Sequence, residues 1–214
     1  MISRRFILWI GVFWTTTLMA TEEPKFEILR ADGKIEIRRY APLIVAETLV
    51  DGDMASASGT GFRRIADYIF GDNARIAMTV PVVAEPQQRA EKIAMTKPVS
   101  IEPQHDDNRP FSNARRWRIH FVMPSQYTLA TLPKPLSADV QLREIPAQTF
   151  AALTYSGTTT ESIAQEKTAE LLDWLTAQQI EIIGSPQLAR YNPPWTLPFL
   201  RRNEILQEIR FTAP

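Results

Sequence analysis

The sequence predicts an α+β fold: a distorted antiparallel β-barrel of two sheets with two flanking helices and pseudo-duplicated βαββ modules. Three observations support this prediction. Short segments in which polar and apolar residues alternate recur along the chain, as half-buried strands require. Two longer segments have the apolar spacing of amphipathic helices. The order strand, helix, strand, strand occurs over residues 43–99 and again over residues 148–211, which indicates an internal duplication.

The predicted strands are short and separated by turn residues. The first two flank Asp32-Gly33, a strong hairpin turn signal. Proline or glycine ends several of the others, because neither residue continues a ladder well. In chain order we expect strands at residues 26–30, 34–40, 43–50, 76–82, 93–99, 115–123, 140–145, 149–155, 181–183, 187–191 and 203–211.

Both predicted helices have recognisable ends. Asp53 can cap the first helix and Gly71 can stop it. Its apolar stripe should face a sheet and consists of Phe62, Ile65, Ala66 and Ile69. Residues 158–161 offer caps for the second helix, which should run to about Gln179. Its buried stripe is predicted to include Ala164, Leu171, Leu172 and Leu175.

One heptapeptide occurs twice, as Ile-Ala-Met-Thr-Val-Pro-Val at 76–82 and as Ile-Ala-Met-Thr-Lys-Pro-Val at 93–99. Two β-prone segments joined by a polar linker predict a hairpin, here the central one of the first module. Alternation places Met78 and Met95 on the same face as the isoleucines. Two interpretations stay open: the methionines fill the core, or they line a pocket.

Composition excludes several kinds of site. The 214 residues include 44% hydrophobic ones, enough for a sizeable core in one domain. Lysine plus arginine equals aspartate plus glutamate at 24 each, so no charge excess favours nucleic acid, and we expect none as a partner. The absence of cysteine excludes disulfides, thiolate metal sites, a cysteine nucleophile and covalent c-type haem attachment.

The N-terminal segment has the layout of a secretory signal peptide. Residues 1–5 are basic, residues 6–20 carry no charge, and polar residues follow from Thr21. The uncharged run is short for a membrane span, which needs about 20 residues. We therefore expect residues 1–20 to be a signal peptide cleaved after Ala20, with residues 21–214 exported to the periplasm as one domain. The alternative is an uncleaved membrane anchor at residues 6–20, which would keep the domain near the membrane.

No catalytic or metal-binding motif stands out. The two histidines, His105 and His120, have no Glu-x-x-His partner, and no Gly-x-Ser-x-Gly motif occurs. His120 should share a strand face with Arg116 and Arg118, which suggests contact with solvent or an acidic group. We therefore expect neither a metal site nor an enzyme. A hydrolase of small esters or tetrapyrrole side chains is the enzymatic alternative.

Paired arginines are the most distinctive polar feature. Guanidinium groups bind carboxylates in a bidentate way, while methionine and tryptophan can surround a flat apolar body. A solvated rim of arginines is the ordinary alternative for each pair. The candidate ligand-binding residues are therefore Arg38, Arg39, Arg63, Arg64, Met78, Met95 and His120.

Several segments, spread over about residues 24–211, resemble the SOUL/haem-binding protein family. They are IEIRRY at 35–40, GFRRIADYIFG at 61–71, both IAMTxPV copies, FVMPSQYTL at 121–129, LPKP at 132–135, YNPPWT at 191–196 and PFLRRNE at 198–204. The resemblance implies a distorted barrel of two antiparallel sheets flanked by helices, similar to the duplicated modules of gyrase-inhibitor-like effector-binding domains. It also implies non-covalent binding of haem or a related tetrapyrrole, without catalysis. The family has no universal axial ligand.

The expected function is that of a tetrapyrrole carrier or buffer. If haem binds, we expect methionines and arginines to matter more than a histidine, which a comparison of Met78→Ala with His120→Ala would test. A second hypothesis is an effector-type module for other amphipathic small molecules, such as a lipid or an apolar cation.

Overall fold

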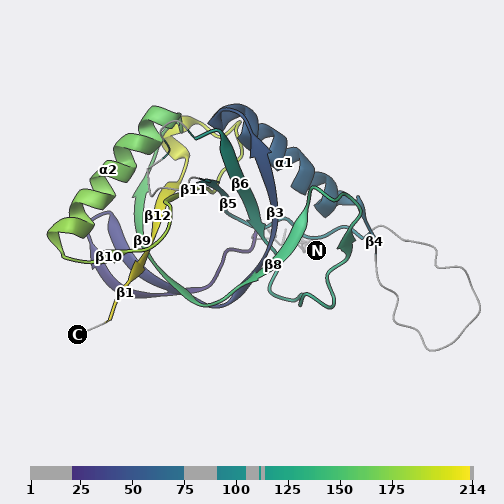
Figure 1. Ribbon diagram of the computed structural model, residues 1–214, viewed down its shortest axis with the longest axis horizontal. Helices are drawn as coiled ribbons and strands as arrows, with labels where there is room; N and C mark the ends of the chain where they lie inside the picture. The colour runs from purple at the N-terminus through teal and green to yellow at the C-terminus, as the bar shows by residue number, and fades with distance from the viewer. Residues whose placement is uncertain (1–20, 75–90, 105–110, 112–113, 213–214) are drawn as a thin grey trace, which may run out of the picture.

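The structure, a computed structural model, describes residues 21–74, 91–104, 111 and 114–212. Its described strands form one large antiparallel sheet that curls into an open half-barrel, with both helices on the outside (Figure 1). Along the sheet the strand order is β1 (Phe26–Asp32), β2 (Ile35–Tyr40), β9 (Gln148–Tyr155), β12 (Asn203–Arg210), β11 (Gln187–Arg190), β5 (Val99–Pro103), β6 (Arg116–Val122), β3 (Leu43–Asp51) and β8 (Gln141–Ile145). The short β10 (Glu181–Ile182) pairs with β12, while β4 (Asn73–Ala74) and β7 (Lys134–Pro135) form a separate pair.

The duplication predicted from the sequence is present, but the first module extends to Val122 and not, as predicted, to Val99. Strands β3, β5 and β6 with helix α1 (Met54–Phe70) make one βαββ module, and β9, β11 and β12 with α2 (Glu161–Ala177) make the other. The modules meet where β11 pairs with β5. Each is extended by a strand that directly precedes the other module: β8 leads into β9 but pairs with β3, and β2 leads into β3 but pairs with β9. The predicted α+β distorted barrel with two flanking helices is confirmed.

The helices begin at the predicted caps. The Asp53 carboxylate accepts hydrogen bonds from the backbone N–H groups of Ala55 and Ser56, and the Thr160 hydroxyl accepts one from Ile163. Gly71 ends α1 with a φ of 145°, a conformation that favours glycine. Within the described ranges, neither helix nor any other is long and apolar enough to span a bilayer.

Helix α1 lies very close to the sheet. A Cβ atom added at Gly61 would stand 2.7 Å from Cγ1 of Ile119 on β6, so the helix approaches at a distance that only glycine permits. Ile65 and Ile69 are buried against the same sheet. Phe62, predicted to lie in this stripe, is instead partly exposed at the edge of the contact, where its ring packs against Phe121.

The prediction that the two heptapeptide copies form a hairpin is wrong. The first copy, with Met78, lies outside the described residues. In the second copy residues 93–98 are not a strand, and β5 begins at Val99, the last residue of that copy. Their polar groups bond elsewhere: the Ile93 N–H donates to the carbonyl of Ile69, and the Thr96 hydroxyl donates to that of Val122. The central hairpin of the first module is therefore formed by β5 and β6, which lie further along the chain than the predicted pair of strands.

Candidate functional site

The inner face of the half-barrel carries the polar and aromatic side chains that the helices do not cover. On β6 the alternation turns Trp117, Ile119 and Phe121 outward into the core beneath α1. Arg118 and His120 therefore point the other way, toward the inside of the curl. The face predicted to contact solvent or an acidic group is thus the inner face, because α1 covers the opposite one, and Arg118 contacts the carboxylates of Glu47 and Glu102 there.

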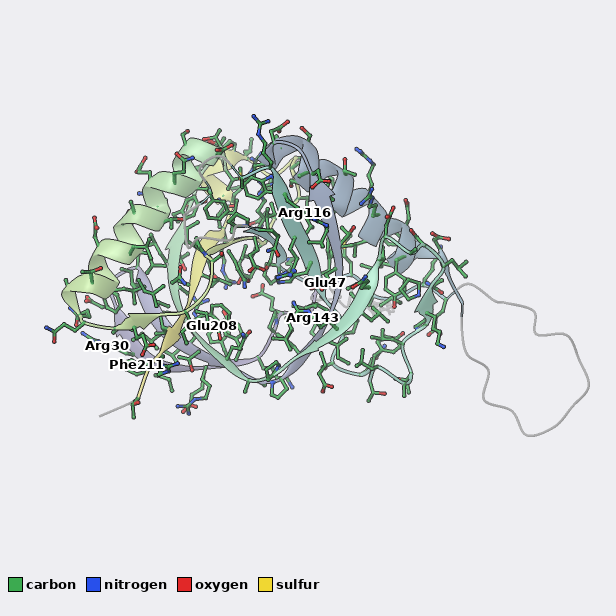
Figure 2. The ribbon with its side chains drawn as sticks, viewed as in Figure 1. Arg30, Glu47, Arg116, Arg143, Glu208 and Phe211 are labelled. Atoms are coloured by element: carbon green, nitrogen blue, oxygen red, sulfur yellow. The ribbon has the colours of Figure 1, made fainter. Side chains whose placement is uncertain are left out.

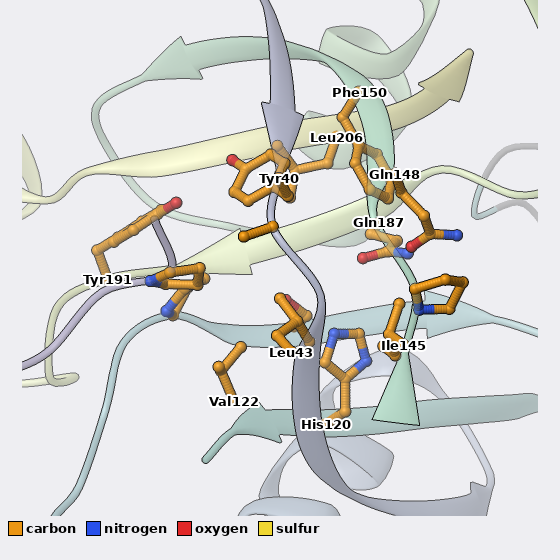
Figure 3. A pocket seen from close by; sticks show the side chains of 15 residues that line it. Tyr40, Leu43, His120, Val122, Ile145, Gln148, Phe150, Gln187, Tyr191 and Leu206 are labelled. Atoms are coloured by element: carbon orange, nitrogen blue, oxygen red, sulfur yellow. The ribbon is translucent and has the colours of Figure 1, made fainter. Parts of the chain in front are cut away.

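A small pocket lies on this face between the two modules (Figure 3). Its cavity of about 50 Å³ has room for a few water molecules. Aromatic and aliphatic side chains form most of its wall, with His120 and several hydroxyl and amide groups among them. The lining residues are Pro24, Tyr40, Ala41, Leu43, Pro98, Ser100, His120, Val122, Ile145, Pro146, Gln148, Phe150, Gln187, Tyr191 and Leu206.

His120 is the chemically distinctive group of the small pocket. Its side chain is 6% exposed, and no hydrogen-bond partner for Nδ1 exists among the described residues. Burial lowers the pKa of His120 to about 4; the nearby Glu47 carboxylate opposes this shift, and Arg143 and Arg118 add to it. At neutral pH the imidazole is therefore uncharged and keeps a nitrogen lone pair, the form that ligates metals.

A larger cavity of about 510 Å³ adjoins the small pocket. The two share Pro24, Ala41, Leu43 and Val122 as a common wall. The volume lies in the range of small-molecule sites, roughly 300–1,000 Å³. Its lining is apolar over Ile44, Met123, Pro124, Tyr127 and Leu129, and it contains the charged groups Glu22, Glu23, Lys25 and Glu144.

Residues 22–25 line the larger cavity, Pro24 also lines the small pocket, and the segment connects the modules. The Glu22 carboxylate accepts from the backbone N–H of Ser125, and the Glu22 carbonyl accepts from that of Lys97. Arg202, which precedes β12 in the other module, donates to the Glu23 carboxylate at 2.9 Å. The first described residues of the chain are therefore part of the wall rather than a loose end.

A buried charge network lies beside the aromatic wall. Glu204 is completely buried and accepts hydrogen bonds from Arg38 at 2.9 Å and from the Tyr191 hydroxyl at 2.7 Å. Burial alone would raise the pKa of Glu204, but these bonds and the charges of Arg38 and Arg202 outweigh it, so the pKa lies below its usual value. The network fixes the rings of Tyr40 and Tyr191: Arg38 donates to the Tyr40 hydroxyl, and Arg202 lies over the Tyr191 ring.

The other module has its own charged cluster. Glu47 accepts from Arg143 at 2.8 Å and lies 3.6 Å from Arg118, which also donates to Glu102 at 3.2 Å. Figure 2 shows Glu47 and Arg143 side by side inside the curl of the sheet. Burial raises the pKa of Glu102, and Arg118 partly offsets the shift. Each module thus supplies a paired cluster, and the apolar small pocket lies between them.

The model of the SOUL heme-binding protein family matches residues 21–208. The chain belongs to this family. A comparison with curated proteins found no match.

Solved structures show the same fold at low identity. The C-terminal domain of EcmrR is 11% identical with a TM-score of 0.59, over 83% of this chain and 98% of that one. An uncharacterized conserved protein from Listeria innocua is 12% identical with a TM-score of 0.55, over 83% and 92%. A protein described as a hydrolase from the same organism is 12% identical with a TM-score of 0.52, over the same shares. At such identities the likeness concerns the fold alone.

In this SOUL-family chain the arginines predicted for the site are distributed over different surfaces. Arg38 is buried and bonded to Glu204 and Glu36. Arg39 projects from the other face of β2 and pairs with Glu27 at 3.4 Å. On α1, outside the sheet, Arg63 donates to Thr60 and Arg64 lies 3.5 Å from Asp139. In the described part of the chain, none of these four arginines lines either cavity.

The structure describes one of the two predicted methionines and one of the two histidines. Met95 packs against the main core and is not among the cavity-lining residues. Met78 and His105 lie outside the described residues. His120 is the predicted candidate that the structure places at a cavity. Over the described ranges, no three His, Cys, Asp or Glu side chains gather as a metal site.

Sequence reasoning missed the aromatic wall and its charged anchor. Tyr40 and Tyr191 each lie in a segment of the family resemblance, and alternation in β2 puts Tyr40 on the same face as Arg38. That pattern could have identified an inward-facing pair. The link to Glu204 could not be found this way, because 166 residues separate it from Arg38.

Proposed function

We propose that this protein binds haem or a related tetrapyrrole non-covalently, as a carrier or buffer and without catalysing a reaction. Membership of the SOUL heme-binding protein family supports the ligand class. The predicted export signal leads us to propose further that this binding takes place outside the cytoplasm, in the periplasm or at the membrane face.

The observation that carries the proposal is the state of His120. A buried, uncharged imidazole with an unpartnered nitrogen is costly unless something binds it. Iron accepts such a nitrogen, and the surrounding Tyr40, Phe150 and Leu206 suit the apolar edge of a macrocycle. These residues fit haem, whose iron would supply the coordination bond. We therefore rank His120 ahead of the methionines and arginines expected from the sequence.

The two volumes determine how the ligand would be distributed. The small pocket of about 50 Å³ is too small for a macrocycle, so most of the ring would occupy the adjoining cavity of about 510 Å³. Because His120 lines only the small pocket, the ring would have to extend past the shared wall for its iron to reach that imidazole. Leu43 and Val122, in the shared wall, would contact the ring. Lys25, which lines the larger cavity, would pair with a ligand carboxylate.

A titration of the full chain with hemin tests the proposal. We expect a saturable shift of the Soret band, because haem moves from water into an apolar site with a nitrogen ligand. An unrelated protein of similar hydrophobicity serves as the control for non-specific adsorption. A spectrum indistinguishable from that control would refute tetrapyrrole binding.

A second candidate, binding of an amphipathic cation, has a specific observation in its favour. The larger cavity is lined by three carboxylates, Glu22, Glu23 and Glu144, against one ammonium group, Lys25; Arg202 already neutralises Glu23, which leaves Glu22 and Glu144 against Lys25. This balance favours a positively charged apolar ligand over a dianionic one. Competition distinguishes the two: if tetraphenylphosphonium displaces hemin and binds more tightly, the cation is the better ligand. If hemin stays bound at saturating cation, the tetrapyrrole is preferred.

A further inference from the structure

The connection between β11 and β12 exposes an unusual amount of apolar surface. Residues 191–202 contain a short 3₁₀ turn, η1 (Pro198–Leu200), and four large side chains that face solvent. Trp195 is 82% exposed and Phe199 70%, with Leu197 and Leu200 also more than half exposed. Exposed side chains of this size in one loop indicate a surface that contacts something apolar.

The backbone of this loop is already hydrogen-bonded internally. The Arg201 guanidinium donates to the carbonyls of Thr196 at 2.7 Å and Pro194 at 2.6 Å. The N–H groups of Thr196, Leu200 and Arg201 donate to carbonyls within the loop, and its three prolines have no N–H to satisfy. Unpaired backbone N–H and C=O groups are costly in an apolar phase. Many of the backbone groups of this loop are already paired within it, so inserting the loop would leave few unpaired.

The charge of the loop indicates which apolar surface it suits. Residues 191–203 contain no aspartate or glutamate, and Arg201 has no carboxylate partner among the described residues. Trp and Phe side chains beside an arginine are typical of segments that lie at the headgroup level of a bilayer. An isologous contact between two copies would instead bring this cationic loop against itself.

We propose that residues 192–201 form a membrane-docking loop that inserts Trp195, Leu197, Phe199 and Leu200 into the interface of a bilayer containing anionic phospholipid. The loop begins directly after Tyr191, which lines the small pocket. Docking would therefore bring the ligand site close to the lipid surface. The proposal concerns a surface outside both cavities and does not depend on which ligand they bind.

Quenching by brominated lipids tests the insertion in the full chain without any tetrapyrrole. Vesicles of phosphatidylcholine and phosphatidylglycerol with brominated acyl chains should quench Trp195, and the difference between wild type and Trp195→Phe isolates its emission from that of the other tryptophans. We expect strong quenching that weakens in vesicles of phosphatidylcholine alone. Unquenched Trp195 emission in the mixed vesicles would overturn the proposal.

Paired substitutions test whether the loop supplies the affinity. Leu197→Ala/Phe199→Ala should weaken partitioning into the mixed vesicles by about tenfold or more, since two apolar side chains lose their burial. Leu136→Ala/Phe70→Ala is the matched control, because both residues are 54% exposed elsewhere on the surface. Residues 1–20 are present in every variant, so the differences report the loop. Equal losses in both variants, or a loss of self-association in place of vesicle binding, would contradict membrane docking.

Discussion

Acid should destabilise the protein through His120 more than through an ordinary histidine. Burial lowers the pKa of His120 from 6.5 to about 4, with Glu47 opposing the shift and Arg143 and Arg118 adding to it. In the unfolded chain the imidazole gains a proton near pH 6.5, whereas the folded protein resists protonation until about pH 4. The stabilising contribution of the neutral form is therefore complete above pH 6.5 and is lost as the pH falls toward 4.

The size of this effect follows from the shift. Each pKa unit corresponds to about 1.4 kcal/mol, so the free energy of unfolding should fall by about 2–3 kcal/mol between pH 7.5 and pH 4.5 through this group alone. Urea unfolding of wild type and His120→Gln at both pH values isolates it, because other groups titrate in both proteins. We expect the variant to lose about 2–3 kcal/mol less on acidification. An equal loss in both proteins would show that His120 titrates normally and would refute its burial as a neutral base.

Two further substitutions test the packing that supports the site. Gly61→Ala should destabilise the protein by about 1–3 kcal/mol in urea unfolding, because the new methyl group would collide with Ile119. Gly59→Ala is the control and should be neutral or stabilising, because its methyl group would lie 3.9 Å from the flexible end of the Arg63 side chain. Arg38→Met should lower the free energy of unfolding by about 3 kcal/mol or more, because Glu204 would lose its buried partner. The double substitution Arg38→Met/Glu204→Met should recover part of that loss. An Arg38→Met variant as stable as wild type would contradict the assigned network.

Local pattern predicted most of the secondary structure, because alternation and capping are properties of short segments. The strand pairing was harder to predict. β2 and β8 each lie next in sequence to a strand of one module yet pair with the other, and no local signal encodes such an exchange. The heptapeptide at 93–99 has a strand-like period, but Pro98 and the bonds to Ile69 and Val122 keep residues 93–98 out of the ladder.

The types of residue at the candidate site were easier to predict from the sequence than their positions in the fold. From the sequence alone, either face of β6 could have been the one that a helix covers. Because α1 packs on the Ile119 face, His120 points inward. The paired arginines look alike in sequence, yet Arg38 points into the curl and Arg39 away from it, because neighbours in a strand face opposite sides. Only the tertiary pairing with Glu204 shows that Arg38 is already neutralised.

The most direct test of tetrapyrrole binding at His120 compares hemin with metal-free protoporphyrin IX. In wild type both should bind, since both share the flat apolar ring. His120→Ala should weaken hemin by about tenfold or more and shift its Soret band while leaving protoporphyrin binding unchanged, because a lost ligand costs at least as much as a lost outer-shell partner. Met95→Ala, a core substitution away from both cavities, should leave the hemin spectrum unaltered. If His120→Ala binds hemin with the wild-type spectrum and affinity, the account of this site is wrong.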